Sequence, residues 1–100
     1  MKARFIEPAE AEADEAVAYF EQQLEGLGER FQNDLEHTVS LIIDYPLIGS
    51  PLTKRIRKFR LRQFHYNVVY VVVEDEIVIV AVAHHKKRPR YWRRRMAQLS

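Results

Sequence analysis

The chain has 100 residues, of which 47% are hydrophobic and 30% are charged, and its formal net charge is +2. This length fits one compact domain, and the composition is that of an ordinary globular protein. The absence of cysteine excludes a disulfide framework and thiolate metal ligands, and no apolar stretch is long enough to cross a membrane. We therefore expect a single domain over residues 1–100, located in the cytoplasm, with no membrane contact and no cofactor.

The first half of the chain predicts one strand and two helices. Residues 3–6 (ARFI) are typical of a short strand. Residues 8–25 start with a proline, which suits the first turn of a helix, and repeat apolar residues at helical spacing. Gly26 and Gly28 end this helix. The second helix ends near Asp44, and its apolar face holds Phe31, Leu35, Val39 and Ile42. A short break between two long helices indicates an antiparallel helical hairpin.

The second half of the chain predicts a sheet. Residues 46–52 form a loop with two prolines, and residues 55–64 then alternate, with much of one side cationic. Residues 66–73 are β-branched and aromatic, which favours a central strand, and an acidic turn leads to a last strand at 77–83. The tail RPRYWRRRMAQL is compatible with a short final helix or with a mobile segment. The sequence therefore predicts an α+β fold: an N-terminal strand, an antiparallel helical hairpin, and a three-stranded antiparallel meander that completes one small sheet.

Charge is segregated along the chain. Residues 1–53 carry three basic and eleven acidic side chains, a balance of −8, whereas residues 54–100 carry thirteen basic and three acidic side chains, a balance of +10. The cations form two clusters, one before the central strand and one after the last strand. We expect the two clusters to converge on one surface that attracts a polyanion or an acidic protein. The alternative is a basic surface that only keeps the domain in solution.

Few other residues suggest chemistry. His84 and His85 are adjacent, so on an extended chain they point to opposite faces, and we expect no metal site. His84 is a candidate acid or base because its reference pKa lies near neutrality, the alternative being a strand-end histidine with an ordinary hydrogen bond. The carboxylates of the first helix follow its solvated face, which argues against catalysis by a carboxylate pair.

The order of these segments resembles the RelE/ParE superfamily of toxins from bacterial type II toxin–antitoxin systems. The resemblance covers nearly the whole chain: AEADEAVAYFEQQLEGLGERFQNDLE, then YPLIGSPL, then RKFRLRQFHYNVVYVVVEDEIVIVAVAHHKKRPRYWRRR. The last block is similar to the family pattern of a basic residue, an aromatic-Pro-Tyr, a tyrosine-bearing strand and H-x-x-R-x-P-x-Y-W. Here His65 replaces the usual proline, and one extra cation lengthens the spacing from histidine to proline.

The resemblance implies growth inhibition, plasmid stabilisation, and a cognate antitoxin with an acidic segment that folds on binding. It offers two mechanisms. RelE-like members cut messenger RNA on the ribosome, which would make the protein an endoribonuclease. ParE-like members poison DNA gyrase and have no established hydrolytic site. In the RelE-like case the catalytic residues would be Lys58, Arg60, His84, Arg88 and Tyr91. However, the arginine expected after the tyrosine of the central strand is Asn67 here, and asparagine supplies no positive charge to a phosphate in transfer.

We therefore favour the ParE-like branch, with DNA gyrase as the target. The residues expected to contact the target are Arg57, Arg60, Arg62, Lys86, Lys87, Arg88, Arg93 and Trp92. The alternatives are the RelE-like ribonuclease, with the ribosome as its target, and a small basic nucleic-acid-binding module without toxicity. The last would bind nucleic acid with an affinity that falls steeply with salt.

Overall fold

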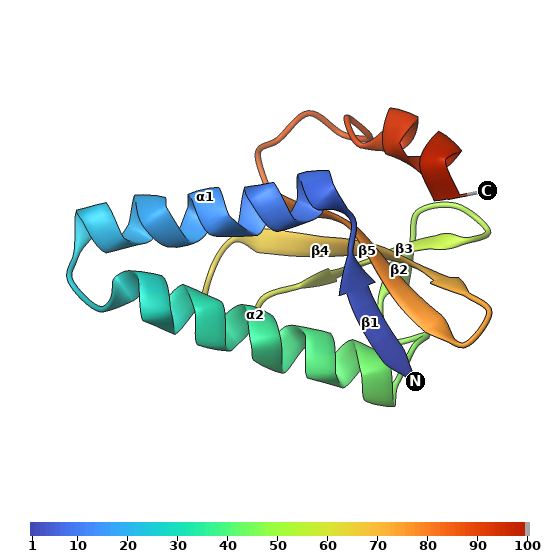
Figure 1. Cartoon of the computed structure of the whole chain (residues 1–100), viewed down its shortest axis with the longest axis horizontal. Coiled ribbons are helices and arrows are strands. Elements are labelled where there is room, and N and C mark those ends of the chain that lie inside the picture. Colours follow the sequence, from blue (N-terminus) through green and yellow to red (C-terminus); the bar gives the residue numbers. More distant parts are fainter. Residues whose placement is uncertain (100) are drawn as a thin grey trace.

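A computed structural model describes residues 1–99 and has two helices on one five-stranded sheet (Figure 1). The elements in chain order are β1 (Lys2–Phe5), α1 (Glu7–Gln23), α2 (Leu27–Asp44), β2 (Ser50–Pro51), β3 (Ile56–Arg60), β4 (Tyr66–Val73), β5 (Glu76–His84) and the 3-10 helix η1 (Arg93–Leu99). The predicted α+β fold is confirmed, and its C-terminal tail contains a short helical segment.

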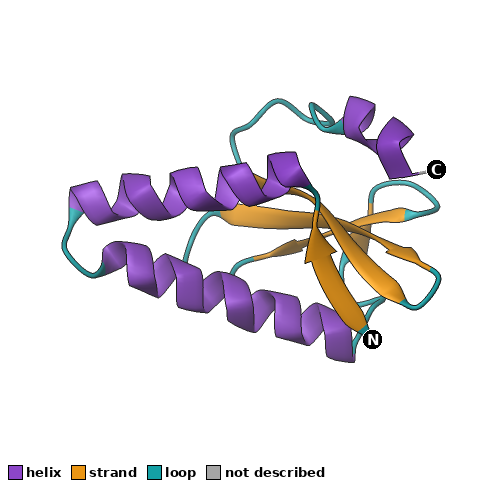
Figure 2. Ribbon diagram, in the orientation of Figure 1, coloured by secondary structure: helices purple, strands orange, loops and turns teal. Residues whose placement is uncertain are grey.

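The two helices form the predicted antiparallel hairpin, which Figure 2 shows alongside the sheet. Gly26 takes a left-handed conformation, with φ of 87°, and this turns the chain between the helices. Gly28 lies where the helices approach each other most tightly, because a Cβ added there would stand 2.7 Å from the carbonyl oxygen of Val17. The Glu21 carboxylate accepts hydrogen bonds from both glycine N–H groups. Small residues and one carboxylate therefore fix the hairpin turn.

The sheet has the order β1-β5-β4-β3-β2. β3, β4 and β5 form the predicted antiparallel meander, while β1 pairs with β5 in parallel, with Lys2 opposite Glu76 and Phe5 opposite Ile79. β4 and β5 are buried over most of their length, in agreement with their apolar sequences. The first strand of the chain thus lies beside the last.

Two segments differ from the sequence prediction. Part of the predicted 46–52 loop forms the two-residue strand β2, which pairs with β3. The alternating segment 55–64 leaves the sheet after Arg60. The cause is Asp34 of α2, which is buried and accepts hydrogen bonds from the N–H groups of Arg62 and Gln63 at 3.2 and 2.8 Å. A carboxylate from the hairpin therefore holds the chain in a turn where alternation alone predicts continued strand.

An aromatic cluster joins the hairpin to this turn. Phe20 of α1 and Phe31 of α2 lie 5.4 Å apart between ring centroids, and Phe64 lies within 5.1 Å of both. Tyr66 packs edge-on against Phe31 at 5.0 Å. These contacts place the start of β4 against the hairpin, so the sheet and the helices share one core.

Candidate functional site

The free edge of β5 is closed by side chains. β1 pairs with residues 76–79 of β5, and within residues 1–99 no other strand lies beside the edge beyond them. There the Glu12 carboxylate accepts a hydrogen bond from the Val82 N–H at 3.1 Å, and the Arg95 guanidinium donates to the Val80 carbonyl at 2.9 Å. These two side chains satisfy backbone groups that an additional strand would otherwise pair.

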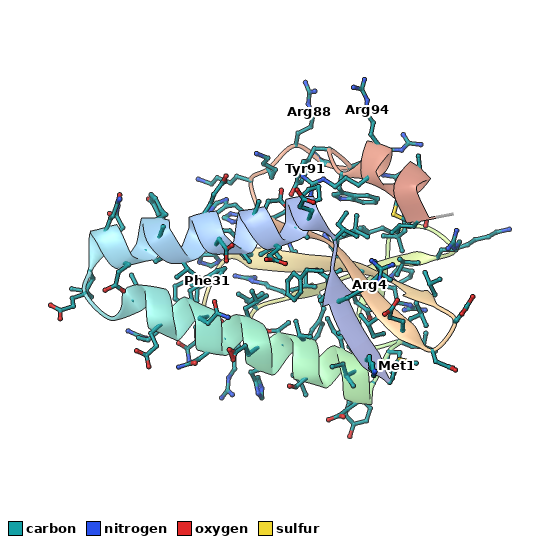
Figure 3. The ribbon with its side chains drawn as sticks, viewed as in Figure 1. Met1, Arg4, Phe31, Arg88, Tyr91 and Arg94 are labelled. Atoms are coloured by element: carbon teal, nitrogen blue, oxygen red, sulfur yellow. The ribbon has the colours of Figure 1, made fainter. Side chains whose placement is uncertain are left out.

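Glu12 also holds the C-terminal segment, residues 85–99, against α1. Its carboxylate forms an ion pair with Arg95 at 2.8 Å, and both side chains are less than one-fifth exposed. The Tyr91 hydroxyl donates to the other carboxylate oxygen at 2.5 Å, and the Arg95 guanidinium lies 5.0 Å from the Tyr91 ring centroid. Figure 3 shows Tyr91 pointing from this segment towards the start of α1. One carboxylate therefore docks about fifteen residues of chain.

The environment of Tyr91 limits its chemistry. Burial, followed by the hydrogen bond to Glu12 and the charge of that carboxylate, raises the pKa of the Tyr91 hydroxyl well above its ordinary value. The hydroxyl therefore stays protonated at neutral pH and acts as a hydrogen-bond donor to Glu12.

Next to the contacts of Glu12 with Tyr91 and Arg95 lies a hollow of about 170 Å³ that is lined by cations from both clusters. Lys58 of β3 comes from the first cluster, and Lys87, Arg88 and Arg90 come from the second. We call this pocket the basic hollow. Its apolar wall contains Trp92, which is only 4% exposed. Lys58 is thus the member of the first cluster that lines the basic hollow, whereas Arg60 lies in an adjoining depression and Arg57 and Arg62 lie elsewhere.

A second, more open depression adjoins the basic hollow, and we call it the outer hollow. The two hollows share Lys58, Asn67 and His85, and the outer hollow adds Arg60 and Ile48. Arg60 is hydrogen-bonded to Nδ1 of His65. Asn67, which stands where the RelE pattern has arginine, lies opposite Arg60 on the neighbouring strand and lines both hollows without adding charge.

The histidines gather at the rim of these hollows. The ring centroids of His84 and His85 are 4.5 Å apart, and His65 lies 5.2 Å from His85. Nδ1 of His84 accepts a hydrogen bond from the Lys86 N–H at 3.1 Å. Partial burial, followed by the nearby His85, Lys86 and His65, lowers the pKa of His84. His84 is consequently neutral at pH 7, with one nitrogen engaged.

The residues of the RelE-like catalytic set are close together but have different neighbours. Lys58, His84, Arg88 and Tyr91 line the basic hollow, and Arg60 lines the outer one. Arg88 points outwards into solvent (Figure 3). The set contains no unengaged base, because Tyr91 is protonated and His84 accepts from the backbone.

The residues predicted to contact a target divide into several locations. Lys87 and Arg88 line the basic hollow, and Arg60 lines the outer one, whereas Lys86 and Arg93 are exposed outside both. Arg57 donates to the carbonyl oxygens of Leu47 and Gly49, at 3.2 and 2.7 Å, so it braces a loop. Arg62 lies beside α2, close to Asp34 and His37. Trp92 is a core residue in this structure, so its ring is covered.

Sequence reasoning missed Glu12 and Arg95. We expected the carboxylates of α1 to follow the solvated face, and Glu12 is an exception, with a side chain that is only 18% exposed. The available signal was its spacing: Glu12 follows Ala9 by three residues and precedes Ala16 by four, and both alanines are buried. Arg95 gave no such signal within a run of three arginines.

Within residues 1–99, no group of three or more His, Asp or Glu side chains is arranged to hold a metal ion. Across the same residues, no helix has the length and apolar character needed to cross a membrane.

Comparison with known proteins identifies the class. A chain from the chromosomal ParDE toxin–antitoxin system of P. aeruginosa superposes with a TM-score of 0.67 at 16% identity, covering 84% of this chain and 95% of that one. The isolated E. coli RelE toxin superposes with a TM-score of 0.63 at 17% identity, covering 98% and 97%. No curated protein matches by sequence. The fold is that of the RelE/ParE toxins.

The family model of the ParE toxin of the type II toxin–antitoxin system parDE matches residues 3–89. The chain therefore belongs to the family of ParE toxins. The resemblance that the sequence motifs indicated is confirmed.

Proposed function

We propose that the protein is a cytoplasmic toxin that inhibits bacterial growth by poisoning DNA gyrase, and that a cognate antitoxin with an acidic segment neutralises it. Membership of the ParE family is the observation that carries this proposal. The cations of the basic hollow support it, because they suit an acidic protein surface or a protein–DNA complex.

The hydrogen bond of Tyr91 and the missing charge at Asn67 support a binding function rather than phosphoryl chemistry. The Tyr91 hydroxyl is hydrogen-bonded to Glu12, and Asn67 adds no positive charge to the two hollows that it lines. A ribonuclease of the RelE type needs a proton acceptor and a dense positive field around the phosphate that is attacked.

The deciding experiment runs two assays on the same purified protein: inhibition of gyrase-catalysed supercoiling, and ribosome-dependent cleavage of a messenger RNA. We expect inhibition of supercoiling and no cleavage. Lys2→Ala, at the exposed start of β1, is the control and should behave as the wild type. Cleavage of the messenger with unaffected gyrase would reverse the proposal. Absence of any growth defect on induced expression would argue against both toxin mechanisms.

The RelE-like alternative is favoured by one observation, the shared position of Lys58, His84 and Arg88 around the basic hollow. It makes a separate prediction for Tyr91→Phe. If the protein poisons gyrase, this variant should keep its growth arrest and lose only about 1–2 kcal/mol of stability, because the hydroxyl serves Glu12. If Tyr91 transfers a proton, messenger cleavage and growth arrest should both fall steeply. Growth curves and chemical denaturation of the same variant measure the two effects.

A further inference from the structure

The loop between α2 and β2 exposes apolar side chains beside the cationic surface. Tyr45 is 63% exposed, Leu47 is 70% exposed and Ile48 is 39% exposed. We call residues 45–48 the apolar turn. Single exposed apolar residues are ordinary, but three within four positions make a patch, and such patches mark interaction sites.

The apolar turn is held firmly despite its exposure. The Tyr70 hydroxyl, on a fully buried side chain of β4, donates to the Pro46 carbonyl at 2.7 Å and accepts from the Gly49 N–H at 3.0 Å. Arg57 donates to the carbonyl oxygens of Leu47 and Gly49. A Cβ on Gly49 would stand 2.8 Å from the Lys58 carbonyl oxygen, so the loop lies directly against β3. A loop fixed in this way loses little conformational entropy when a partner binds, which favours affinity.

Cations lie on the β3 side of the apolar turn. Arg57 donates a hydrogen bond to the Leu47 carbonyl, whereas the acidic Asp44 directly precedes Tyr45. Ile48 itself lines the outer hollow together with Lys58, Arg60 and His85. Apolar anchors with charges around them are the arrangement of a protein interface, in which the apolar centre supplies affinity and the charged rim supplies orientation.

We propose that Tyr45 and Leu47 are the anchors by which this toxin docks on its target, a folded protein with an apolar pocket and an acidic rim. The side chains project from the surface, so they must enter a concavity on the partner. A disordered antitoxin segment presents no such concavity and would instead need a groove on the toxin. This inference rests on the proposed function, in which the target is DNA gyrase, and adds the surface that makes the contact.

The test compares two matched double variants. Tyr45→Ser with Leu47→Ser removes the anchors, while Tyr19→Ser with Leu24→Ser removes one exposed tyrosine and one exposed leucine from the far end of α1, where they are 55% and 61% exposed. All four side chains are mostly in solvent, so both variants should keep the wild-type unfolding midpoint. We expect the concentration for half-inhibition of purified gyrase to rise at least about tenfold for the first variant and to stay unchanged for the second.

A photo-crosslinking residue at position 47 or position 24 gives a direct readout in cells. We expect a toxin–gyrase product from position 47 only. Equal inhibition by both double variants would overturn the proposed surface while leaving gyrase as the target. If the wild-type toxin arrests growth without inhibiting gyrase, the proposed function fails, and the growth arrest of the two variants then tests the surface. A product at position 47 with a ribosomal component or with a short acidic polypeptide would assign the apolar turn to another occupant. A wild type that arrests no growth and inhibits no gyrase would refute both proposals.

Discussion

Glu12 accepts four hydrogen bonds from residues that lie 70 or more positions away in the chain. Its two carboxylate oxygens accept from the Val82 backbone, from both terminal nitrogens of Arg95 and from the Tyr91 hydroxyl. One side chain thus joins the helical hairpin, the edge of the sheet and the C-terminal segment. Its neighbours on the helix, such as Glu15, have the same charge and are exposed.

Removing this carboxylate should leave the mostly buried Arg95 guanidinium without its partner. We expect Glu12→Ala to lower the free energy of unfolding by about 2–4 kcal/mol. This loss is somewhat smaller than that for a fully buried ion pair, because both side chains keep some contact with solvent. Urea denaturation measures the change. Glu15→Ala is the matched control and should change stability by no more than about 0.5 kcal/mol. Equal losses in the two variants would contradict the role given to Glu12.

The lowered pKa of His84 gives a pH dependence with a definite sign. In the unfolded chain the histidine pKa is about 6.5, so between that value and the lower folded pKa the unfolded state binds more protons. Stability is therefore complete above about pH 6.5 and declines as the pH falls below it. We expect the decline between about pH 7.5 and 5.5 to be smaller in His84→Gln than in the wild type. His37→Gln, on the exposed face of α2, serves as the control, and an identical decline in all three proteins would refute this account.

At the scale of elements, the strands and helices with uninterrupted patterns were predictable. β4 and β5 are apolar throughout, and α2 repeats Phe31, Leu35 and Ile42 on its buried face, so local sequence is sufficient. The end of β3 was not predictable, because Asp34, 28 residues earlier in the chain, sets it through hydrogen bonds to the backbone. β2 escaped prediction for a similar reason, since a two-residue strand has no period and depends on its partner.

The same distinction applies to the candidate site. Sequence clusters predicted that cations would meet, and Lys58 does meet Lys87 and Arg88. The sequence could not separate exposed cations from Arg57 and Arg95, which brace backbone carbonyls. The roles of the site residues in binding or catalysis stay predictions.

The hairpin turn offers a test of element packing. Alanine normally favours a helix over glycine by up to about 1 kcal/mol. At Gly28, however, the added methyl group would meet the Val17 carbonyl oxygen at 2.7 Å and press α1 away from α2. We expect Gly28→Ala to lower the free energy of unfolding by about 1–3 kcal/mol, with changed near-ultraviolet circular dichroism from the aromatic cluster.

Gly26→Ala is the contrasting variant for this test. Nothing lies within 4 Å of the added atom, so it introduces only the strain of a left-handed φ. It should cost about 1–2 kcal/mol and leave the near-ultraviolet spectrum unchanged. A Gly28→Ala variant that is as stable as the wild type would show that the helices can separate freely.

On the scale of the whole molecule, charge is divided between elements. The two helices hold ten of the fourteen carboxylates, whereas β3 and the residues after β5 hold most of the cations. Acidic and basic side chains thus stand on different elements even though the net charge is only +2. The field of the basic elements orients an acidic partner before contact.

This segregation of charge should make target association sensitive to salt. Raising the ionic strength from about 0.05 M to about 0.2 M shortens the range of surface electrostatics. We expect the association rate constant with gyrase to fall on the order of tenfold over this range, while the dissociation rate changes much less. Surface plasmon resonance at several salt concentrations measures both rates. A salt effect on the dissociation rate constant alone would mean that the cations act only after docking.

The parallel pairing of β1 with β5 has a consequence for how this toxin is made. The sheet cannot close until the last strand exists, and the bond between Glu12 and Arg95 spans 83 positions. Contacts of such long range form late, so a nascent chain holds no finished toxin fold until β5 and Arg95 have left the ribosome. The topology of the sheet therefore delays folding of the toxin, and an inhibitor can be present in the cell before the folded toxin first forms.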